Sequence, residues 1–350
     1  MGRNESKEMM AAKSRILIGT SGFSYPDWHG TFYPSDFKTH KIHELQFVAE
    51  FFEFCEINNS FYRPVNPEVA KKWCEYVSNN KEFQFTAKLT EVFTHAPGRG
   101  NKESSSAETI RYTAQDVTDA KKGFEPIANA GRLGALLLQF PISFKYTEGN
   151  WDHLIDVLHL FREFPLAVEV RHKTWADPLV LKALQQENIA FCNIDQTRLG
   201  QTLEGTHYVT SSLAYLRLHG RSKEWFTAKS RDGRYDYLYS KESLQKIKGK
   251  IERMADTAEV TFVAANNHPR GQAAANAVEL KSLLTGEKVS APEILVNTYP
   301  VLEEFAIPES MDALVTSHEE NLGTGQKETR TPRGKRKKDR PNEGQQDLPL

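Results

Sequence analysis

The sequence of 350 residues predicts a single (β/α)8 barrel of the TIM type, followed by a disordered basic C-terminal tail. Eight short apolar runs rich in β-branched and aromatic residues alternate with segments of helical periodicity, within about 280 residues. Such alternation is typical of a parallel sheet covered by helices. A doubly wound sheet usually has about six strands and often a GxGxxG turn after the first, whereas the first turn here reads GTSGFSY.

The predicted strands are, in order, 15–22, 54–61, 83–89, 133–140, 165–172, 189–195, 213–220 and 260–267. The predicted helices are 42–52, 67–78, 115–130, 151–161, 178–187, 241–254 and 271–284. Pro67 and Pro178 support two helix starts, because proline is favoured in a first turn, where its missing N–H needs no partner. The segment 196–212 is too short to predict a helix, and 89–113 is predicted as a long loop.

Composition divides the chain into a flexible N-terminus (1–14), the barrel (15–305), and a linker with the basic tail (306–350). Residues 323–350 contain eight Lys or Arg and four Asp or Glu, a net charge of +4, which leaves −5 for the rest of a chain whose total is −1. This segment has almost no apolar residues, so we expect disorder. Its RGKRKK run at 333–338 suggests nucleic-acid contact, but a solvated tail is the commoner explanation.

Other features exclude whole classes of protein. No run approaches the roughly 18 apolar residues that a membrane span needs, and the polar N-terminus does not resemble a secretory signal. Cys55, Cys74 and Cys192 have no CxxC spacing and lie in or beside apolar runs, so neither a disulfide scaffold nor a zinc knuckle is expected. A cytoplasmic location fits best.

Polar residues alternate with apolar ones in several predicted strands, as Glu169 and Arg171 do with Val168 and Val170. We expect the polar sets to face the barrel axis near the C-terminal strand ends, where sites occur in this fold, and the apolar sets to face the helices. The expected inward residues are Glu56, Asn58, Lys88, Gln139, Glu169, Arg171, Asn193, Asp195, Arg217, His219 and one of Asn266 or Asn267. Such groups are costly to bury unless they pair or bind a ligand, so a self-satisfied salt-bridge layer is the alternative to a site.

The loops after the strands add aromatic and hydrogen-bonding groups. They include Tyr25, Trp28, Tyr62, His95 and Trp175. Aromatic walls around a polar floor suit a ring-bearing or sugar-like ligand, although each aromatic taken singly is more often a packing residue.

The blocks that carry these residues resemble the YecE-like family, catalogued as domain of unknown function 72. The blocks are GTSGFSY at 19–25, EINNSFYR at 56–63, FQFTAK at 83–88, LQFP at 138–141, VEVRH at 168–172, YLRLHGR at 215–221 and NNH at 266–268. The resemblance covers about 16–302 and implies a TIM-type barrel. It implies no reaction, and the similarity of this fold to sugar-phosphate isomerases and apurinic-site endonucleases is an analogy of fold alone.

The first functional hypothesis is an enzyme, such as a lyase, isomerase or hydrolase, that acts on a small anionic substrate. Lys88, Arg171 and Arg217 would bind the anion, which is a phosphorylated or carboxylated, sugar-like molecule. Glu169 or Glu56 would be the general base and His219 the acid. The same two carboxylates would alternatively form a glycosidase-like pair if their separation were suitable.

Two other hypotheses remain open. A nucleic-acid binding or phosphodiester-processing protein would use the basic tail, although the body of the chain is acidic. A non-catalytic small-molecule binding protein would have the same pocket. No cofactor is predicted. A divalent metal ion is an open alternative, with candidate ligands among Glu56, Glu169, Asp195, His95, His219 and His268, but the chain has no HxH or HExxH spacing to support it, and the arginines would repel such an ion. The sequence leaves the oligomeric state open.

Overall fold

The computed structural model describes residues 14–97, 105–197, 200–203, 205–222 and 232–314. The chain divides into a unit of residues 1–311 and a second unit, 312–350, of which only the first three residues are described. The first unit contains the barrel. The predicted flexible N-terminus, except for Ser14, and the predicted basic tail lie outside the described residues.

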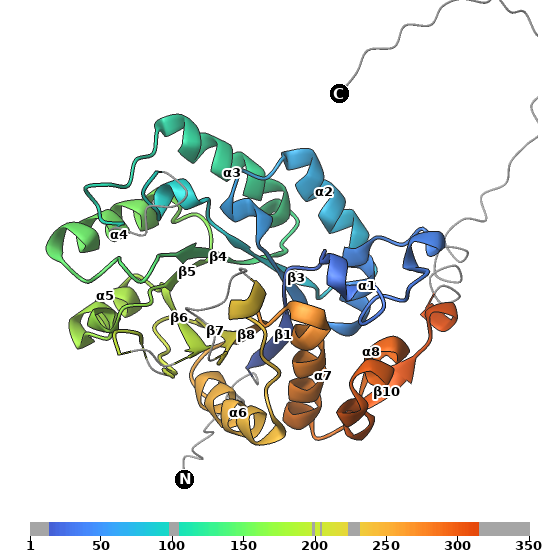
Figure 1. Ribbon diagram of the computed structural model, residues 1–350. Coiled ribbons are helices and arrows are strands. Elements are labelled where there is room, and N and C mark those ends of the chain that lie inside the picture. Colours follow the sequence, from blue (N-terminus) through green and yellow to red (C-terminus); the bar gives the residue numbers. More distant parts are fainter. Residues whose placement is uncertain (1–13, 98–104, 198–199, 204, 223–231, 315–350) are drawn as a thin grey trace, which may run out of the picture. The chain divides into compact units, whose positions relative to one another are not determined.

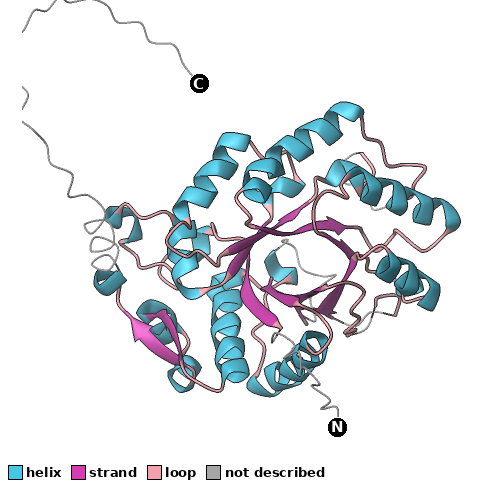
Figure 2. Cartoon of the chain, turned by 180° about the vertical axis from the view of Figure 1, so that it is seen from behind, coloured by secondary structure: helices cyan, strands magenta, loops and turns pink. Residues whose placement is uncertain are grey.

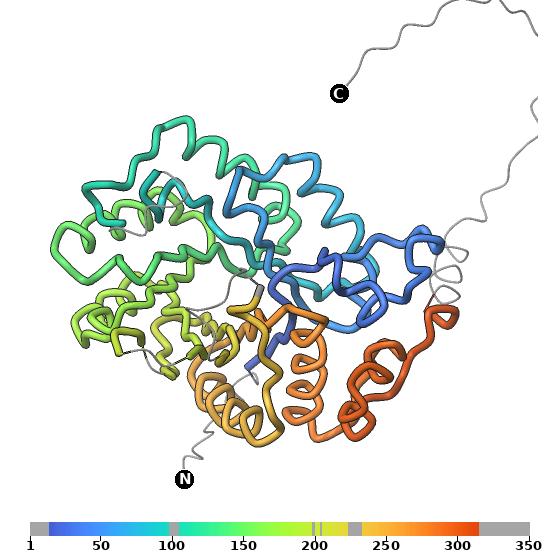
Figure 3. The backbone as a smooth tube through the Cα atoms, viewed as in Figure 1, coloured from blue at the N-terminus to red at the C-terminus, as the bar shows by residue number. Residues whose placement is uncertain are grey.

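Eight parallel strands form a closed barrel (Figure 1), which confirms the predicted fold class. They are β1 (Arg15–Ser21), β2 (Phe54–Ile57), β3 (Gln84–Lys88), β4 (Leu133–Gln139), β5 (Leu166–Glu169), β6 (Ala190–Gln196), β7 (Leu213–Gly220) and β8 (Val260–Ala265). The first strand pairs with both the second and the last, so the barrel has no open edge. The tube in Figure 3 shows this closure where the blue N-terminal strand meets the last strand.

Helices surround the strands, as the view from behind shows (Figure 2). The seven predicted helices are all present, as α1 (Glu44–Phe51), α2 (Pro67–Tyr76), α3 (Ala114–Asn129), α4 (Glu148–Leu160), α5 (Pro178–Gln186), α6 (Lys241–Ala255) and α7 (Gln272–Thr285). The two predicted proline starts are correct: Asn66 and Asp177 cap α2 and α5, and each cap side chain accepts a hydrogen bond from a backbone N–H of the first turn.

Short 3-10 helices occupy several connections. They are η1 (Pro26–Trp28), η2 (Phe37–His40), η3 (Asn59–Phe61), η4 (Glu91–Phe93), η5 (Lys173–Trp175), η6 (Asp232–Arg234), η7 (Pro269–Gly271) and η8 (Pro300–Glu304). Among them, η1, η3, η4, η5 and η7 lie in connections that begin at the C-terminal end of a barrel strand.

Strand register determines which side chains share the interior. Ser21 is the partner of Glu56, Glu56 is the partner of Thr86, and Gln139 is the partner of Glu169. Below this polar layer lies an apolar core that includes Leu17, Phe54, Ala135, Leu137, Ala167, Cys192, Ile194, Leu213, Tyr215, Phe262 and Ala264. The barrel is therefore a packed core with its polar groups concentrated at one end.

The predicted orientation of β6 is wrong. Its apolar residues Cys192 and Ile194 pair with the inward-facing Tyr215 and Arg217, so Asn193 and Asp195 point away from the axis. The connection after β6 explains the reversal, because it returns along the outside of the strand and satisfies the Asn193 amide. Asn193 donates to the Tyr208 carbonyl and accepts from the Tyr208 N–H, both at 2.8 Å.

The ordered fold continues past the predicted boundary at residue 305. The strands β9 (Val289–Pro292) and β10 (Ala306–Glu309) form a two-stranded parallel sheet, and α8 (Glu293–Thr298) lies between them. These four-residue strands each contain a proline and have no run of β-branched residues, so no local pattern predicts them.

Candidate active site

A buried arginine connects two buried carboxylates inside the C-terminal end of the barrel. Arg217 of β7 donates from Nε and Nη2 to Oε2 and Oε1 of Glu56 on β2, at 2.9 and 2.7 Å. Its Nη1 donates to Oε2 of Glu169 on β5 and, at 3.3 Å, to Oε1 of Gln139. All three ionised side chains are 0% exposed. The bidentate geometry is the one in which arginine binds a carboxylate most strongly.

Further donors complete the coordination of both carboxylates. Glu56 also accepts hydrogen bonds from the Ser21 hydroxyl and, at 2.7 Å, from the Tyr215 hydroxyl. Glu169 also accepts from Arg171, at 2.9 Å from Nε and 2.8 Å from Nη2. Every oxygen of the two carboxylates therefore has a donor, which offsets the cost of burying the charges.

These contacts determine the ionisation of the network. Burial by itself would raise the pKa of Glu56, but Arg217 and Lys88 outweigh it and the pKa is lowered. Burial likewise opposes ionisation of Glu169, yet Arg217, Arg171 and His219 hold its pKa well below the ordinary value. Both side chains are consequently carboxylates at neutral pH and are weak bases.

His219 lies beside this network and is neutral at neutral pH. Burial lowers its pKa to about 4, and the opposing effect of Glu169 does not compensate. The Asn266 amide nitrogen lies 2.7 Å from Nδ1, which makes Nδ1 the acceptor and leaves the proton on Nε2, 3.5 Å from the Glu169 carboxylate.

Lys88, at the end of β3, differs from the two arginines. Its side chain is only 7% exposed, and within the described part of the chain its amine has no hydrogen bond or ion pair. Nζ lies 5.8 Å from the centroid of the Phe61 ring. Burial and the neighbouring Arg217 lower the pKa of Lys88 to about 7, although Glu56 and Glu169 act in the opposite direction.

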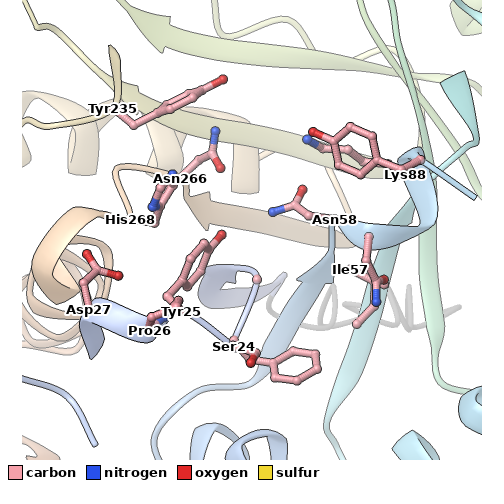
Figure 4. A pocket seen from close by; sticks show the side chains of 14 residues that line it. Ser24, Tyr25, Pro26, Asp27, Ile57, Asn58, Lys88, Tyr235, Asn266 and His268 are labelled. Carbon is pink, nitrogen blue, oxygen red and sulfur yellow. The ribbon is translucent and has the colours of Figure 1, made fainter. Parts of the chain in front are cut away.

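A cavity of about 330 Å³ lies over these strand ends and is open to solvent. Its polar lining includes Asn58, Lys88 and Asn266, whose side chains extend toward the same space (Figure 4). Its aromatic lining includes Phe23, Tyr25, Tyr62, Tyr235 and His268. This volume is near the lower end of the range for small-molecule sites, and the mixture of ring faces and a few polar groups is typical of them.

A turn at Gly22 positions the Tyr25 side chain in one wall of the cavity. The Tyr25 ring stacks on His268 with centroids 4.5 Å apart and planes at 3°, and its hydroxyl donates to the Ser21 carbonyl. Gly22 has φ +92°, and a Cβ atom there would lie 2.5 Å from the Tyr25 hydroxyl oxygen. Only glycine permits both this backbone conformation and this approach.

The structure places most of the sequence-predicted site residues in the cavity wall or in the buried network beside it. Tyr25, Asn58, Tyr62, Lys88 and Asn266 line the cavity. Glu56, Gln139, Glu169, Arg171, Arg217 and His219 form the buried network beside it. His95 lies next to this network, with its ring edge-on to Phe61, and burial lowers its pKa to about 4.

Four predicted binding residues lie outside the cavity and the buried network, because each is bound to another group of the protein. Trp28 and Trp175 are fully buried packing residues whose ring N–H groups donate to the carbonyls of His268 and Phe144. Asn267 donates to Asn276 of α7. Asp195, on the outside of β6, forms a bidentate pair with Arg221 at 2.7 Å and accepts from Tyr239.

Sequence reasoning missed several contributors. Ser21 and Tyr215 donate to Glu56, and their place on inward-facing strand positions was the available signal. Tyr235 comes from the loop between β7 and α6. It was not predicted because it lies far along the sequence from the end of β7.

The described residues lack two features that would indicate other kinds of site or location. No group of three or more His, Cys, Asp or Glu side chains there is arranged to hold a metal ion. Within the same residues, no helix has the length and apolar character that a membrane crossing requires.

Known proteins are similar to this chain over most of its length. UPF0759 protein YunF of Bacillus subtilis (strain 168) is 26% identical over 281 residues, which cover 77% of this chain and 94% of that protein. A solved DUF72 family protein from Thermotoga maritima MSB8 is 30% identical, with a TM-score of 0.65 over 77% of this chain and 99% of that one. Another from Enterococcus faecalis V583, at 22% identity and a TM-score of 0.63 over 77% and 95% of the two chains, shows the fold alone. The family model described as "Protein of unknown function DUF72" matches residues 17–297, which confirms the resemblance seen in the sequence: the chain belongs to the DUF72 family.

Proposed function

We propose that this protein is an enzyme that binds a polar anionic small molecule, phosphorylated or carboxylated and sugar-like, in the cavity and acts on it by acid–base chemistry. One observation carries the proposal: Lys88 presents a nearly buried amine to the cavity, and that amine has no carboxylate partner within the described residues. An amine whose pKa is about 7 exchanges a proton readily at neutral pH, as a general acid or base must.

The charges around the cavity support an anionic ligand. Arg171 and Arg217 balance Glu56 and Glu169 in the network, so protonated Lys88 leaves this group with one excess positive charge. A ligand that carries negative charge, or develops it during reaction, would be stabilised there.

The network residues suit a supporting role in this proposal. The sequence assigned the general base to Glu169 or Glu56 and the acid to His219, but all three are fully buried and have lowered pKa values. Groups of this kind create a fixed electrostatic environment, whereas a proton-transfer group needs a pKa near the working pH and access to the substrate.

The test combines ligand binding with proton exchange. Ribose 5-phosphate and ribonate should raise the thermal unfolding temperature of the wild-type protein, because a ligand that binds only the folded state stabilises it. In D2O, NMR should show loss of a ligand C–H signal in the presence of the wild-type protein.

Lys88→Met should abolish the exchange. Lys145→Met, which changes an exposed lysine in the loop between β4 and α4, should leave it unaltered. Binding without exchange would favour a non-catalytic binding protein, and exchange that survives in Lys88→Met would refute the role of this amine.

We also propose a cytoplasmic location. The supporting observation is that Cys55, Cys74 and Cys192 are all free thiols, two of them buried, as expected in a reducing compartment. Fractionation of the source cells with an antibody to the protein would test this, and recovery outside the cytoplasmic fraction would refute it.

A further inference from the structure

We propose that the substrate carries an aldehyde or ketone carbonyl and that the Lys88 amine attacks this carbonyl to form an imine. This inference rests on the proposed function, since it takes the cavity to be an active site, and it names the substrate class. The proposal is based on the position of the Lys88 amine, which lies at the end of β3 and faces a cavity of about 330 Å³. The neighbouring carboxylates, Glu56 and Glu169, are already bound by other cations.

The side chain that faces the cavity is a lysine, whereas arginines bind the buried carboxylates. Arg171 and Arg217 hold the two buried carboxylates, and arginine remains charged in proteins. Lysine can lose its proton when it is desolvated or placed next to another cation, and its free amine is then a nucleophile. Burial of Lys88 and the nearby charge of Arg217 both lower the pKa of its amine. A lysine that served only to bind an anion would be expected to remain charged.

An amide oxygen at the edge of the cavity, Asn58 Oδ1, lacks a hydrogen-bond donor within the described residues. The Ser21 hydroxyl gives its single proton to Glu56, so its oxygen must accept from the Asn58 amide nitrogen, 3.0 Å away. This fixes the orientation of the amide and leaves Asn58 Oδ1 buried without a donor in the described chain. Asn58 and Lys88 extend toward the same space (Figure 4). A hydroxyl on the substrate, or on the carbinolamine formed by the attack, would supply the donor that Oδ1 lacks.

The step balances without any other reagent. The Nζ lone pair forms a bond to the carbonyl carbon, the π pair moves to oxygen, and a proton passes from nitrogen to that oxygen to give a carbinolamine. Loss of the hydroxyl group with the remaining N–H proton releases water and forms the C=N bond. Uptake of one proton from solvent gives an iminium ion, which carries the same charge as the original ammonium. Glu56 and Glu169, which favour the protonated amine, favour this cation too.

An iminium ion withdraws electrons from the neighbouring carbon. It would therefore ease the removal of a proton, or the cleavage of a carbon–carbon bond, next to the former carbonyl. The substrate class is consequently a small carbonyl compound with an anionic group, and the reaction class is an isomerisation or a lyase reaction.

The test traps the imine on the full-length protein. Dihydroxyacetone phosphate and pyruvate, which each combine a carbonyl with an anionic group, are incubated with the protein and sodium cyanoborohydride at pH 7. The hydride reduces any imine to a stable secondary amine, and peptide mass spectrometry locates it. An unperturbed lysine is neutral in roughly one molecule in a thousand or fewer at this pH. We expect Lys88 to be modified at least about 100-fold faster than the exposed Lys145, which is the internal reference.

Variants and an alcohol probe separate the possible outcomes. Lys88→Arg keeps the charge but cannot form an imine, and both it and Lys88→Met should lose the adduct while Lys145→Met keeps it. Glycerol 3-phosphate and lactate, which lack the carbonyl, report binding alone through thermal unfolding. If they stabilise the protein but no probe labels Lys88 preferentially, the imine is refuted and the proposed function stands. If there is neither stabilisation nor labelling, both are refuted.

Discussion

Replacing Lys88 by methionine should stabilise the folded protein at neutral pH, even though it should remove activity. The two side chains have similar length, and methionine adapts to irregular spaces. The folded protein lowers the pKa of Lys88 from 10.5 to about 7, chiefly by burial. At 1.36 kcal/mol for each pKa unit, the protonated amine then opposes folding by about 5 kcal/mol. The methionine variant does not carry this penalty.

The size of the effect should depend on pH. Between pH 7 and 10.5 the unfolded chain binds more protons at this site than the folded protein does, so the stability of the wild-type protein rises with pH in this window. The advantage of Lys88→Met should therefore be greatest below pH 7. It should decline by about 1.4 kcal/mol for each pH unit above 7.

Urea unfolding of both proteins at pH 6.5, 8.0 and 9.5 would measure this difference, with Lys145→Met as the control that should show almost none. A methionine variant less stable than the wild-type protein at pH 6.5 would refute the reasoning. A difference that stayed constant over the three pH values would do so as well, because it would mean that folding does not change the protonation of Lys88.

Three further predictions concern buried groups. Arg217→Met should lower the free energy of unfolding in urea by about 3–5 kcal/mol, because it leaves the Glu56 and Glu169 carboxylates buried without their main partner; a loss below 1 kcal/mol would contradict this. In ¹⁵N NMR titrations the ring of His219 should remain neutral down to about pH 5, since burial lowers its pKa to about 4, and protonation near pH 6.5 would disprove the assignment. Burial raises the pKa of Glu279 from 4.5 to about 7, so between these pH values the folded protein binds more protons at this site than the unfolded chain does. The stability of the folded protein therefore falls at this site as the pH rises through 7. Glu279→Gln should therefore increase thermal stability at pH 8 more than at pH 5, and an equal change at both pH values would count against it.

The alternation of apolar runs and helical segments was sufficient to predict the barrel, because each strand and helix has its own local pattern. The alternation did not predict β9 and β10, because these strands are formed by pairing between two short segments and not by local propensity. It also failed for the orientation of β6, where alternation was present but its phase depends on the loop that covers Asn193. Tertiary contacts decide both features.

The candidate site was predictable in location and only partly in chemistry. Glu56, Glu169 and Arg217 could be grouped because polar residues at alternate strand positions face the same way. The distinction between Lys88 and the arginines could not be foreseen, because it depends on which carboxylate each cation reaches and how much water remains around it. Tyr235 enters the cavity from a distant part of a loop, and no spacing rule relates it to the strands.

If the proposed function is correct, the pairing of Arg217 with Glu56 and Glu169 restricts how substrate preference can diverge within this architecture. The donors of this guanidinium are already bound to acceptors of the protein itself, so it contributes little to the recognition of an incoming molecule. Discrimination between substrates would then come from the segments after β1, β2, β7 and β8, which supply Tyr25, Tyr62, Tyr235 and His268. Exchange of these segments between relatives should transfer substrate preference while the strands and their internal ion pairs remain unchanged.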